Sequence, residues 1–151
     1  MRYLIKNNFS SELKRGFGGK AIIFCGEEVS FILQSRYAVL RKKFRLIDKY
    51  GECVAVLRRG MFTVFSKWRI ETSEKRFCLK WKGKLTQDVY LAEVAEMRIE
   101  SILGSRLRAY RLTEKAEETA RLEYGKEYIQ IDAENIEHLC ALLSVSVCTD
   151  W

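Results

Sequence analysis

Basic side chains alternate with aromatic or aliphatic ones in three short stretches of this sequence. Ammonium and guanidinium groups are the usual protein ligands for phosphate oxygens, and cations at alternate positions of a β-strand project from a single face. A positively charged strand face can therefore hold anionic lipid headgroups or another phosphorylated ligand without any catalytic step. The candidate ligand-binding residues are Lys43, Arg45, Lys67, Arg69, Lys80 and Lys82.

The charge of the chain is unevenly distributed. Residues 1–90 contain 20 Lys and Arg against 8 Asp and Glu, a net of +12, and residues 91–151 contain 7 against 12, a net of −5, which together give the overall +7. The basic part is suited to an anionic membrane surface or a phosphorylated ligand. The alternative is a structural or protein-interaction domain without lipid binding, in which the lysines and arginines only form a solvated exterior.

Side chains for catalysis are scarce. The single histidine, His138, has Glu134 and Glu137 as its nearest carboxylates, and we expect a role in capping or packing for it. No Ser-His-Asp or Cys-His set is indicated. The glycine-rich GFGG at residues 16–19 lacks the Lys-Ser/Thr of a P-loop and the spacing of a dinucleotide fingerprint, so we interpret it as a turn. We expect a protein that is not an enzyme and that needs no cofactor or metal.

The five cysteines are interpreted as free, buried thiols of a reducing compartment. Their number is odd, no CxxC spacing occurs, and they lie in apolar surroundings, which indicates neither a disulfide framework nor a zinc site. No stretch reaches the ~20 apolar residues of a spanning helix, and the first residues lack the apolar core of a signal peptide. We expect a cytoplasmic protein that associates with membranes peripherally. The cysteines are Cys25, Cys53, Cys78, Cys140 and Cys148.

The basic residues belong to a repeat of predicted β-hairpins. In KFRLIDKYGECVAVL, Phe44 and Leu46 share one face and Lys43 and Arg45 the other, which is the period of two of a half-buried strand. Residues 48–51 then predict a tight turn, because Asp bonds its own backbone and Gly accepts a positive φ. KAIIFCGEEVSFIL predicts a similar hairpin that turns at Cys25-Gly26-Glu27.

The third hairpin, KWRIETSEKRFCLKW, follows the same pattern. We expect the apolar residues Trp68, Ile70, Phe77, Leu79 and Trp81 to face inward. The basic residues Lys67, Arg69, Lys80 and Lys82 are expected to face outward. Inward aromatics cannot stack on bases, which argues against a nucleic-acid partner. The intervening QSRYAVLRK and RRGMFTVFSK are predicted as further strands, so the whole is an antiparallel meander that is closed or nearly closed.

The second half of the chain is less uniform. DVYLAEVAEMRIESIL is ambiguous, GSRLRAYRL and KEYIQI are compatible with strands, and TEKAEETARLEYG has helical propensity although a strand remains an alternative. Asp132 is then a suitable N-cap for a C-terminal helix containing HLCALLSVSVCT. A helix that is apolar on every side must be enclosed on every side, which a β-barrel achieves. Val145 and Val147 leave a terminal strand as the alternative.

Three segments together resemble the LURP-one-related family, which is similar in fold to the Tubby C-terminal domain and to phospholipid scramblases. They are KKFRLIDKYGECVAVLRR, FSKWRIE and YIQIDAENIEHLCALLSVSVCTDW; the resemblance is weakest over residues 95–124. It implies that residues 1–151 form a single domain, a closed antiparallel barrel of about twelve strands around the hydrophobic C-terminal helix.

The same resemblance bears on function. Tubby-like domains bind phosphoinositides through basic residues, so the resemblance favours an anionic lipid as the ligand. The positions of those residues do not map onto a motif of this sequence, and none is carried over. The resemblance supplies no catalytic residue. A scramblase activity would require insertion into the membrane, for which the sequence contains no segment.

Overall fold

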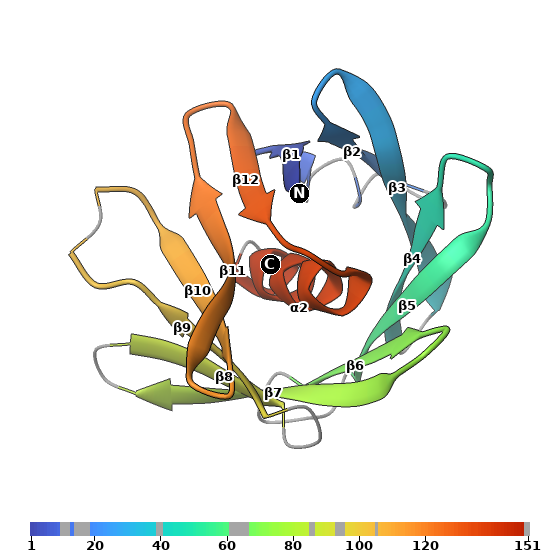
Figure 1. Cartoon of the computed structure of the whole chain (residues 1–151). Coiled ribbons are helices and arrows are strands. Elements are labelled where there is room, and N and C mark those ends of the chain that lie inside the picture. The colour runs from blue at the N-terminus through green and yellow to red at the C-terminus, as the bar shows by residue number, and fades with distance from the viewer. Residues whose placement is uncertain are drawn as a thin grey trace.

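The protein is a closed β-barrel with a helix in its interior (Figure 1). The computed structural model describes residues 1–9, 13, 19–38, 41–60, 67–84, 87–92, 96–104 and 106–149. All neighbouring strands are antiparallel, and β1 closes the barrel by pairing with both β2 and β12. The elements are β1 (Arg2–Lys6), β2 (Lys20–Cys25), β3 (Glu28–Ala38), β4 (Arg41–Asp48), β5 (Cys53–Gly60), β6 (Lys67–Thr72), β7 (Arg76–Lys84), β8 (Gln87–Ala92), β9 (Met97–Ser101), β10 (Ala109–Glu114), β11 (Glu117–Tyr124), β12 (Tyr128–Asp132) and α2 (Ile136–Thr149).

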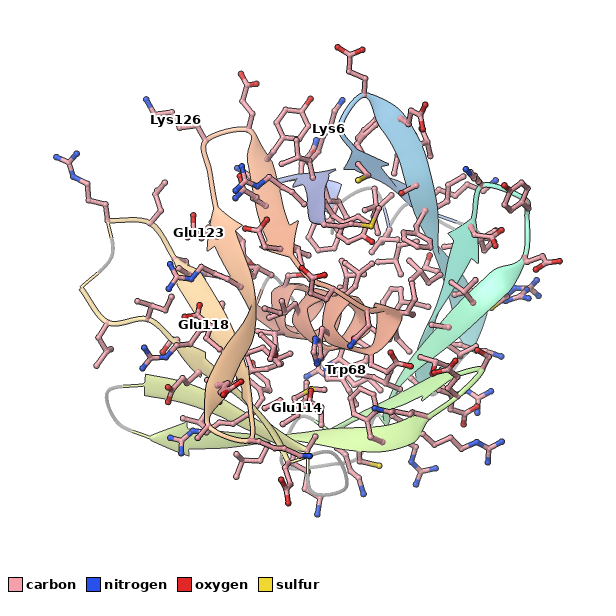
Figure 2. All side chains as sticks on the ribbon, in the orientation of Figure 1. Lys6, Trp68, Glu114, Glu118, Glu123 and Lys126 are labelled. Carbon is pink, nitrogen blue, oxygen red and sulfur yellow. The ribbon has the colours of Figure 1, made fainter. Side chains whose placement is uncertain are left out.

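The alternation of apolar and charged residues determines which side of the wall each residue occupies. Phe44 and Leu46 on β4 are buried, whereas Lys43 and Arg45 between and beside them are partly exposed. On β6 and β7 the expected inward residues are likewise buried, and Figure 2 shows Trp68 beneath the helix. The side chain of Trp81 lies outside the described residues. The expected fold class, a mainly β barrel around a C-terminal helix, is confirmed.

The predicted turn between β4 and β5 is present. The Asp48 carboxylate accepts hydrogen bonds from the backbone N–H groups of Tyr50 and Glu52, both at 2.9 Å, and Gly51 has a φ of +83°. The β2–β3 hairpin turns at Gly26 and Glu27 as expected. These turns need a short polar acceptor and a residue that tolerates positive φ, which is why the sequence reveals them.

Where the structure describes it, the region of open secondary structure forms the strands β8 to β12 and their connections. The helical interpretation of TEKAEETARLEYG is wrong, because Lys115 and Ala116 form a tight turn with φ values of 52° and 66° and β11 follows. Ala120 and Leu122 face the core. Outside, Arg121 Nε donates to Glu118 at 2.8 Å. Cross-strand packing of the alternate apolar residues thus overrides the helical propensity of Glu and Ala.

The segments between the hairpins are not strands of their own where the structure describes them. QSRYA is the end of β3 and the following RK begins β4, so the separate strand expected at QSRYAVLRK is absent; residues 39–40 lie outside the described part. In RRGMFTVFSK, the first three residues end β5 and the lysine begins β6, and residues 61–66 lie outside the described part. The hairpin strands are longer than their apolar runs suggested.

The C-terminal helix begins at Ile136, four residues after Asp132, which was the expected cap. The Asn135 side chain caps it by accepting the backbone N–H of His138 at 2.9 Å. The expectation for Asp132 is wrong, because this residue still belongs to β12, where its carboxylate accepts Arg2 Nε at 3.0 Å. The chain needs residues 133–135 to pass from the wall into the interior before a helix can start.

Helix α2 is enclosed by the barrel wall. Leu139, Leu142, Leu143, Val145 and Val147 are completely buried, and the helix contacts β5, β6, β10, β11 and β12. The terminal-strand alternative is therefore wrong.

Its two serines lie at buried positions but are satisfied within the helix. The Ser144 and Ser146 hydroxyls donate to the Cys140 and Leu143 carbonyl oxygens, both at 2.8 Å. Within the described residues no helix has the length and apolarity to cross a membrane.

The substitution Leu143→Asp tests the enclosure of the helix. It places a carboxylate in the barrel interior without a partner, and we expect the free energy of unfolding to fall by more than about 4 kcal/mol, measured by chemical denaturation. Lys126→Asp, in an exposed turn, is the control and should cost under about 1 kcal/mol. A chain truncated before Ile136 that stayed soluble and unfolded cooperatively would contradict the enclosure.

Candidate anion-binding face

Four cations stand in line across four neighbouring strands on the outside of the barrel. The register pairs Arg36 with Lys43, Lys43 with Arg58, and Arg58 with Arg69. Lys43, Arg58 and Arg69 each adjoin a buried core residue in the chain, namely Phe44, Leu57 and Trp68, so all three project outward, and Arg36 is exposed. Since adjacent strands are ~4.8 Å apart, this cationic row spans roughly 14 Å.

The residues that the structure describes neutralise the cationic row only in part. Arg58 Nη1 lies 3.6 Å from Glu71 Oε1. The structure gives Arg36, Lys43 and Arg69 no ion pair or hydrogen bond of their side chains with the residues it describes. Like charges opposite each other on adjacent strands are destabilising. An anion bound from outside would relieve this repulsion.

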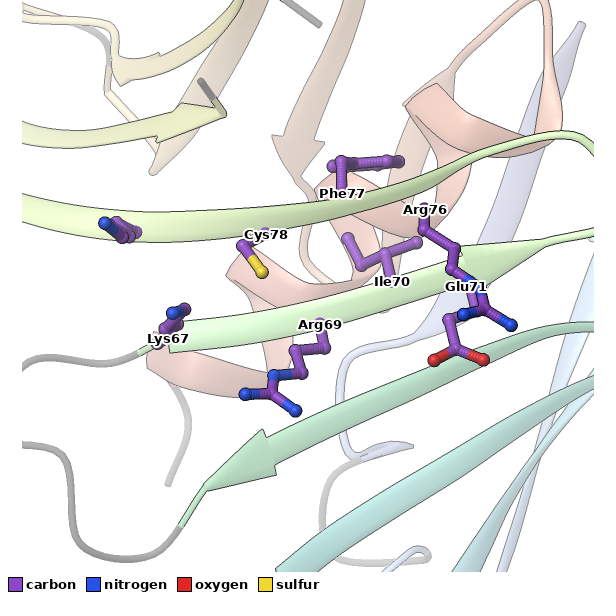
Figure 3. A pocket seen from close by; sticks show the side chains of 8 residues that line it. Lys67, Arg69, Ile70, Glu71, Arg76, Phe77 and Cys78 are labelled. Carbon is purple, nitrogen blue, oxygen red and sulfur yellow. The ribbon is translucent and has the colours of Figure 1, made fainter. Parts of the chain in front are cut away.

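A shallow groove adjoins the row on the outer surface of the β6–β7 hairpin (Figure 3). Its volume is about 330 Å³, within the size range of small-ligand sites. Lys67 stands opposite Lys80 in the register, and Arg69 stands opposite Cys78. Arg76 and Glu71 also line it, so four cations surround the groove against one carboxylate.

The structure brings together most of the predicted binding residues. Lys43 belongs to the row, Arg69 belongs to both row and groove, and Lys67 and Lys80 line the groove. Arg45 does not belong to the row. Its cross-strand partner on β5 is Val56, whose own partner on β6 is the acidic Glu71. Lys82 lies on β7, but its side chain is outside the described residues.

Arg36 is a member of the row that the sequence did not indicate. Its outward parity could have been read from Leu33, three positions earlier and buried. Its alignment with Lys43 could not have been predicted, because the pattern of one strand does not determine its register with the neighbouring strand. Arg58 on β5 is aligned between Lys43 and Arg69.

The charge is also separated along the barrel axis. Consecutive strands are antiparallel, so their connections alternate between two ends. One, the acidic end, has a carboxylate in five of its described connections: Glu27, Glu52, Glu74, Glu96 and Glu134. The other, the basic end, has Lys6, Lys67, Arg106, Arg108 and Lys126 at its described strand termini and connections, and in its described connections Glu127 is the one carboxylate. Helix α2 starts at the acidic end, where the positive pole of its dipole is favoured by carboxylates.

The single histidine joins the helix to the wall. His138 is buried, its Nε2 lies 2.7 Å from Glu114 Oε2, and its Nδ1 has no hydrogen-bond partner among the described residues. Next to it, Thr72 Oγ1 donates to Glu137 at 2.9 Å, which ties the same helix turn to β6. These contacts place His138 in the packing between helix α2 and the barrel wall. Within the described residues, no group of three His, Cys, Asp or Glu side chains could hold a metal ion.

The four cysteines whose side chains the structure describes are free but not uniformly buried. Cys140 in α2 is fully buried, and this burial raises the pKa of its thiol. Cys25 and Cys78 are partly exposed, and the side chain of Cys148 lies outside the described residues. The expectation of burial is wrong for Cys53, which is exposed. A register shift opposite Ile47 interrupts the alternation there, so Cys53 does not follow buried Ala55 into the core.

Comparisons of the chain with protein-family models, with curated proteins and with solved structures gave no match.

Thiol labelling tests the differences in burial among the cysteines. Without reductant, the denatured protein should show all five thiols. In the native protein Cys53 should react fastest and Cys140 only on unfolding, because the thiolate is the reactive form and burial both disfavours it and blocks access. Time-resolved labelling followed by peptide mass spectrometry measures this order, and Cys53→Ser should remove the fast phase. Rapid labelling of Cys140 in the folded protein would contradict the enclosure of the helix.

Proposed function

We propose that this protein is a non-enzymatic module that binds the headgroups of anionic phospholipids through the cationic row and the adjoining groove. The observation that carries the proposal is the alignment of Arg36, Lys43, Arg58 and Arg69 on four neighbouring strands, with Glu71 as the one carboxylate among the described residues that is in ion-pair contact with them. A face of this kind presents several cations to a negative surface at once.

The magnitudes support a membrane as the target. A Lys or Arg close to an anionic leaflet contributes about 1 kcal/mol, so four of them contribute roughly 4 kcal/mol. The attraction fades within a Debye length of ~10 Å at 0.1 M salt. The row lies on the outer surface, where its members can approach a bilayer within that distance. Binding of this type is reversible and sensitive to salt.

The groove adds a place for an individual phosphate. Arg69 can offer a guanidinium fork to phosphate oxygens, and Lys67 and Lys80 add two ammonium groups from opposite strands. The rest of the lining consists of Ile70, Glu71, Arg76, Phe77 and Cys78. The resemblance to LURP-one-related and Tubby-like proteins supports the same ligand class. On this proposal the protein acts at the cytoplasmic surface of a membrane.

The inward aromatics favour a lipid over a nucleic acid. Phe44, Trp68 and Phe77 are buried in the core and cannot stack on bases from outside.

Charge reversal on the face tests the proposal. Lys43→Glu, Lys67→Glu and Arg69→Glu together should weaken binding to phosphatidylserine vesicles by more than about 100-fold, since each cation contributes about 1 kcal/mol and each reversal adds repulsion. The melting temperature should stay nearly constant, because the three side chains point outward. Vesicle co-sedimentation at several salt concentrations measures the effect.

The matched control reverses three cations at the acidic end, Lys49, Lys75 and Lys115, which are exposed. It changes the net charge equally and should reduce vesicle binding only slightly. An equal loss in both variants would mean that binding follows net charge and not the face. A wild-type protein that ignores acidic vesicles even at low salt would overturn the proposal in favour of a protein-interaction domain.

A further inference from the structure

The loop between β9 and β10 exposes apolar side chains at the basic end of the barrel. Leu103 is 65% exposed and Leu107 is 53% exposed. Among the connections that the structure describes, no other has two aliphatic side chains more than half exposed. In Figure 1 the loop extends beyond the strands at the left of the view. Exposed leucines on a projecting loop are unfavourable in water and suited to an apolar phase.

The base of this loop is held firmly. The Ile102 N–H donates to the Ala109 carbonyl and the Tyr124 N–H to the Arg108 carbonyl, both at 2.9 Å. The Arg108 guanidinium lies over the Tyr124 ring, 5.1 Å from its centroid. At the tip, Gly104 adopts a φ of +81°. The leucines are therefore presented on a fixed support rather than by a free chain.

The charges of the loop identify the kind of surface that it fits. Arg106 and Arg108 are exposed and alternate with Leu107, and Lys126 lies in the turn between β11 and β12 at the same end. Apolar tips with cations just behind them match a bilayer interface, where leucines enter the acyl region and arginines stay at the phosphates. This combination favours an anionic bilayer over an apolar protein groove.

The cationic row lies close to the same end. Arg36 and Arg58 are two residues before the last residue of β3 and β5, and Lys43 and Arg69 are two residues after the first residue of β4 and β6. At ~3.3 Å per residue, the row is about 7 Å from these strand termini. One membrane surface at the basic end can thus meet the loop and part of the row together.

We propose that Leu103 and Leu107 insert into the membrane and orient the barrel with its basic end toward an anionic bilayer. This inference rests on the proposed lipid binding and adds an apolar anchor and a defined orientation to it. The leucines supply a part of the binding that salt does not screen, and the cationic row supplies the part that salt removes.

The double substitution Leu103→Ser and Leu107→Ser tests the anchor. The affinity for phosphatidylserine vesicles should fall by roughly tenfold for each leucine. At about 1 M salt, where the screening length is ~3 Å, the wild type should keep residual binding that the double variant lacks. The control is Tyr50→Ser, which removes a 79% exposed side chain from the β4–β5 turn at the acidic end and should leave the affinity unchanged.

Depth-dependent quenching tests the orientation. Tryptophan introduced as Leu103→Trp should be quenched by vesicles of brominated phosphatidylserine beyond the wild-type background, and Tyr50→Trp should not. If wild-type protein binds vesicles but the serine variant binds equally well, or Leu103→Trp is not quenched, the anchor is refuted and the lipid-binding face stands. If the wild type does not bind acidic vesicles at all, the face and the anchor both fail.

Discussion

Enclosure of the C-terminal helix is the constraint on which the rest of the structure depends. Leu139, Leu142, Leu143, Val145 and Val147 point in nearly every direction around the helix, and all are completely buried. An open sheet covers only one side of a helix, so these residues require a wall that closes on itself. Strand β1 closes that wall, because it pairs with both β2 and β12. The helix and the barrel are each incomplete without the other.

This constraint also determines where a function can reside. The inward positions of the strands are occupied by core side chains that pack around the helix, so recognition is left to the outer surface and to the ends. On the outer surface, antiparallel pairing aligns Arg36, Lys43, Arg58 and Arg69 although they come from four separate strands. At the ends, most carboxylates of the described connections lie at the acidic end, which also carries Lys49, Lys75 and Lys115, whereas cations predominate at the basic end. The proposed lipid-binding face follows from the same pairing that closes the barrel.

The sequence predicts the faces of the strands better than their relations to one another. Alternation places Phe44 and Trp68 inside, and residues 48–51 and the apolar tail indicate a turn and a buried helix. The row needs register, which one strand's pattern does not contain. The exposure of Cys53 was not predicted because a register shift interrupts the alternation of the strand. The Glu- and Ala-rich start of β11 was not predicted as a strand with certainty because tertiary packing overrides its helical propensity. Strand β1 and buried Phe9 lie before the first predicted hairpin, which begins at Lys20, so the hairpin repeat does not indicate them.

The most direct measurement of the central claim is a map of backbone amide shifts on titration with short-chain phosphatidylserine below its micelle concentration. The account predicts that the perturbed amides cluster around the cationic row and the β6–β7 groove, at Arg36, Lys43, Arg58, Lys67 and Arg69. The turns of the acidic end should remain unperturbed. Perturbations centred on those turns, or none at lipid concentrations that saturate vesicle binding, would contradict it.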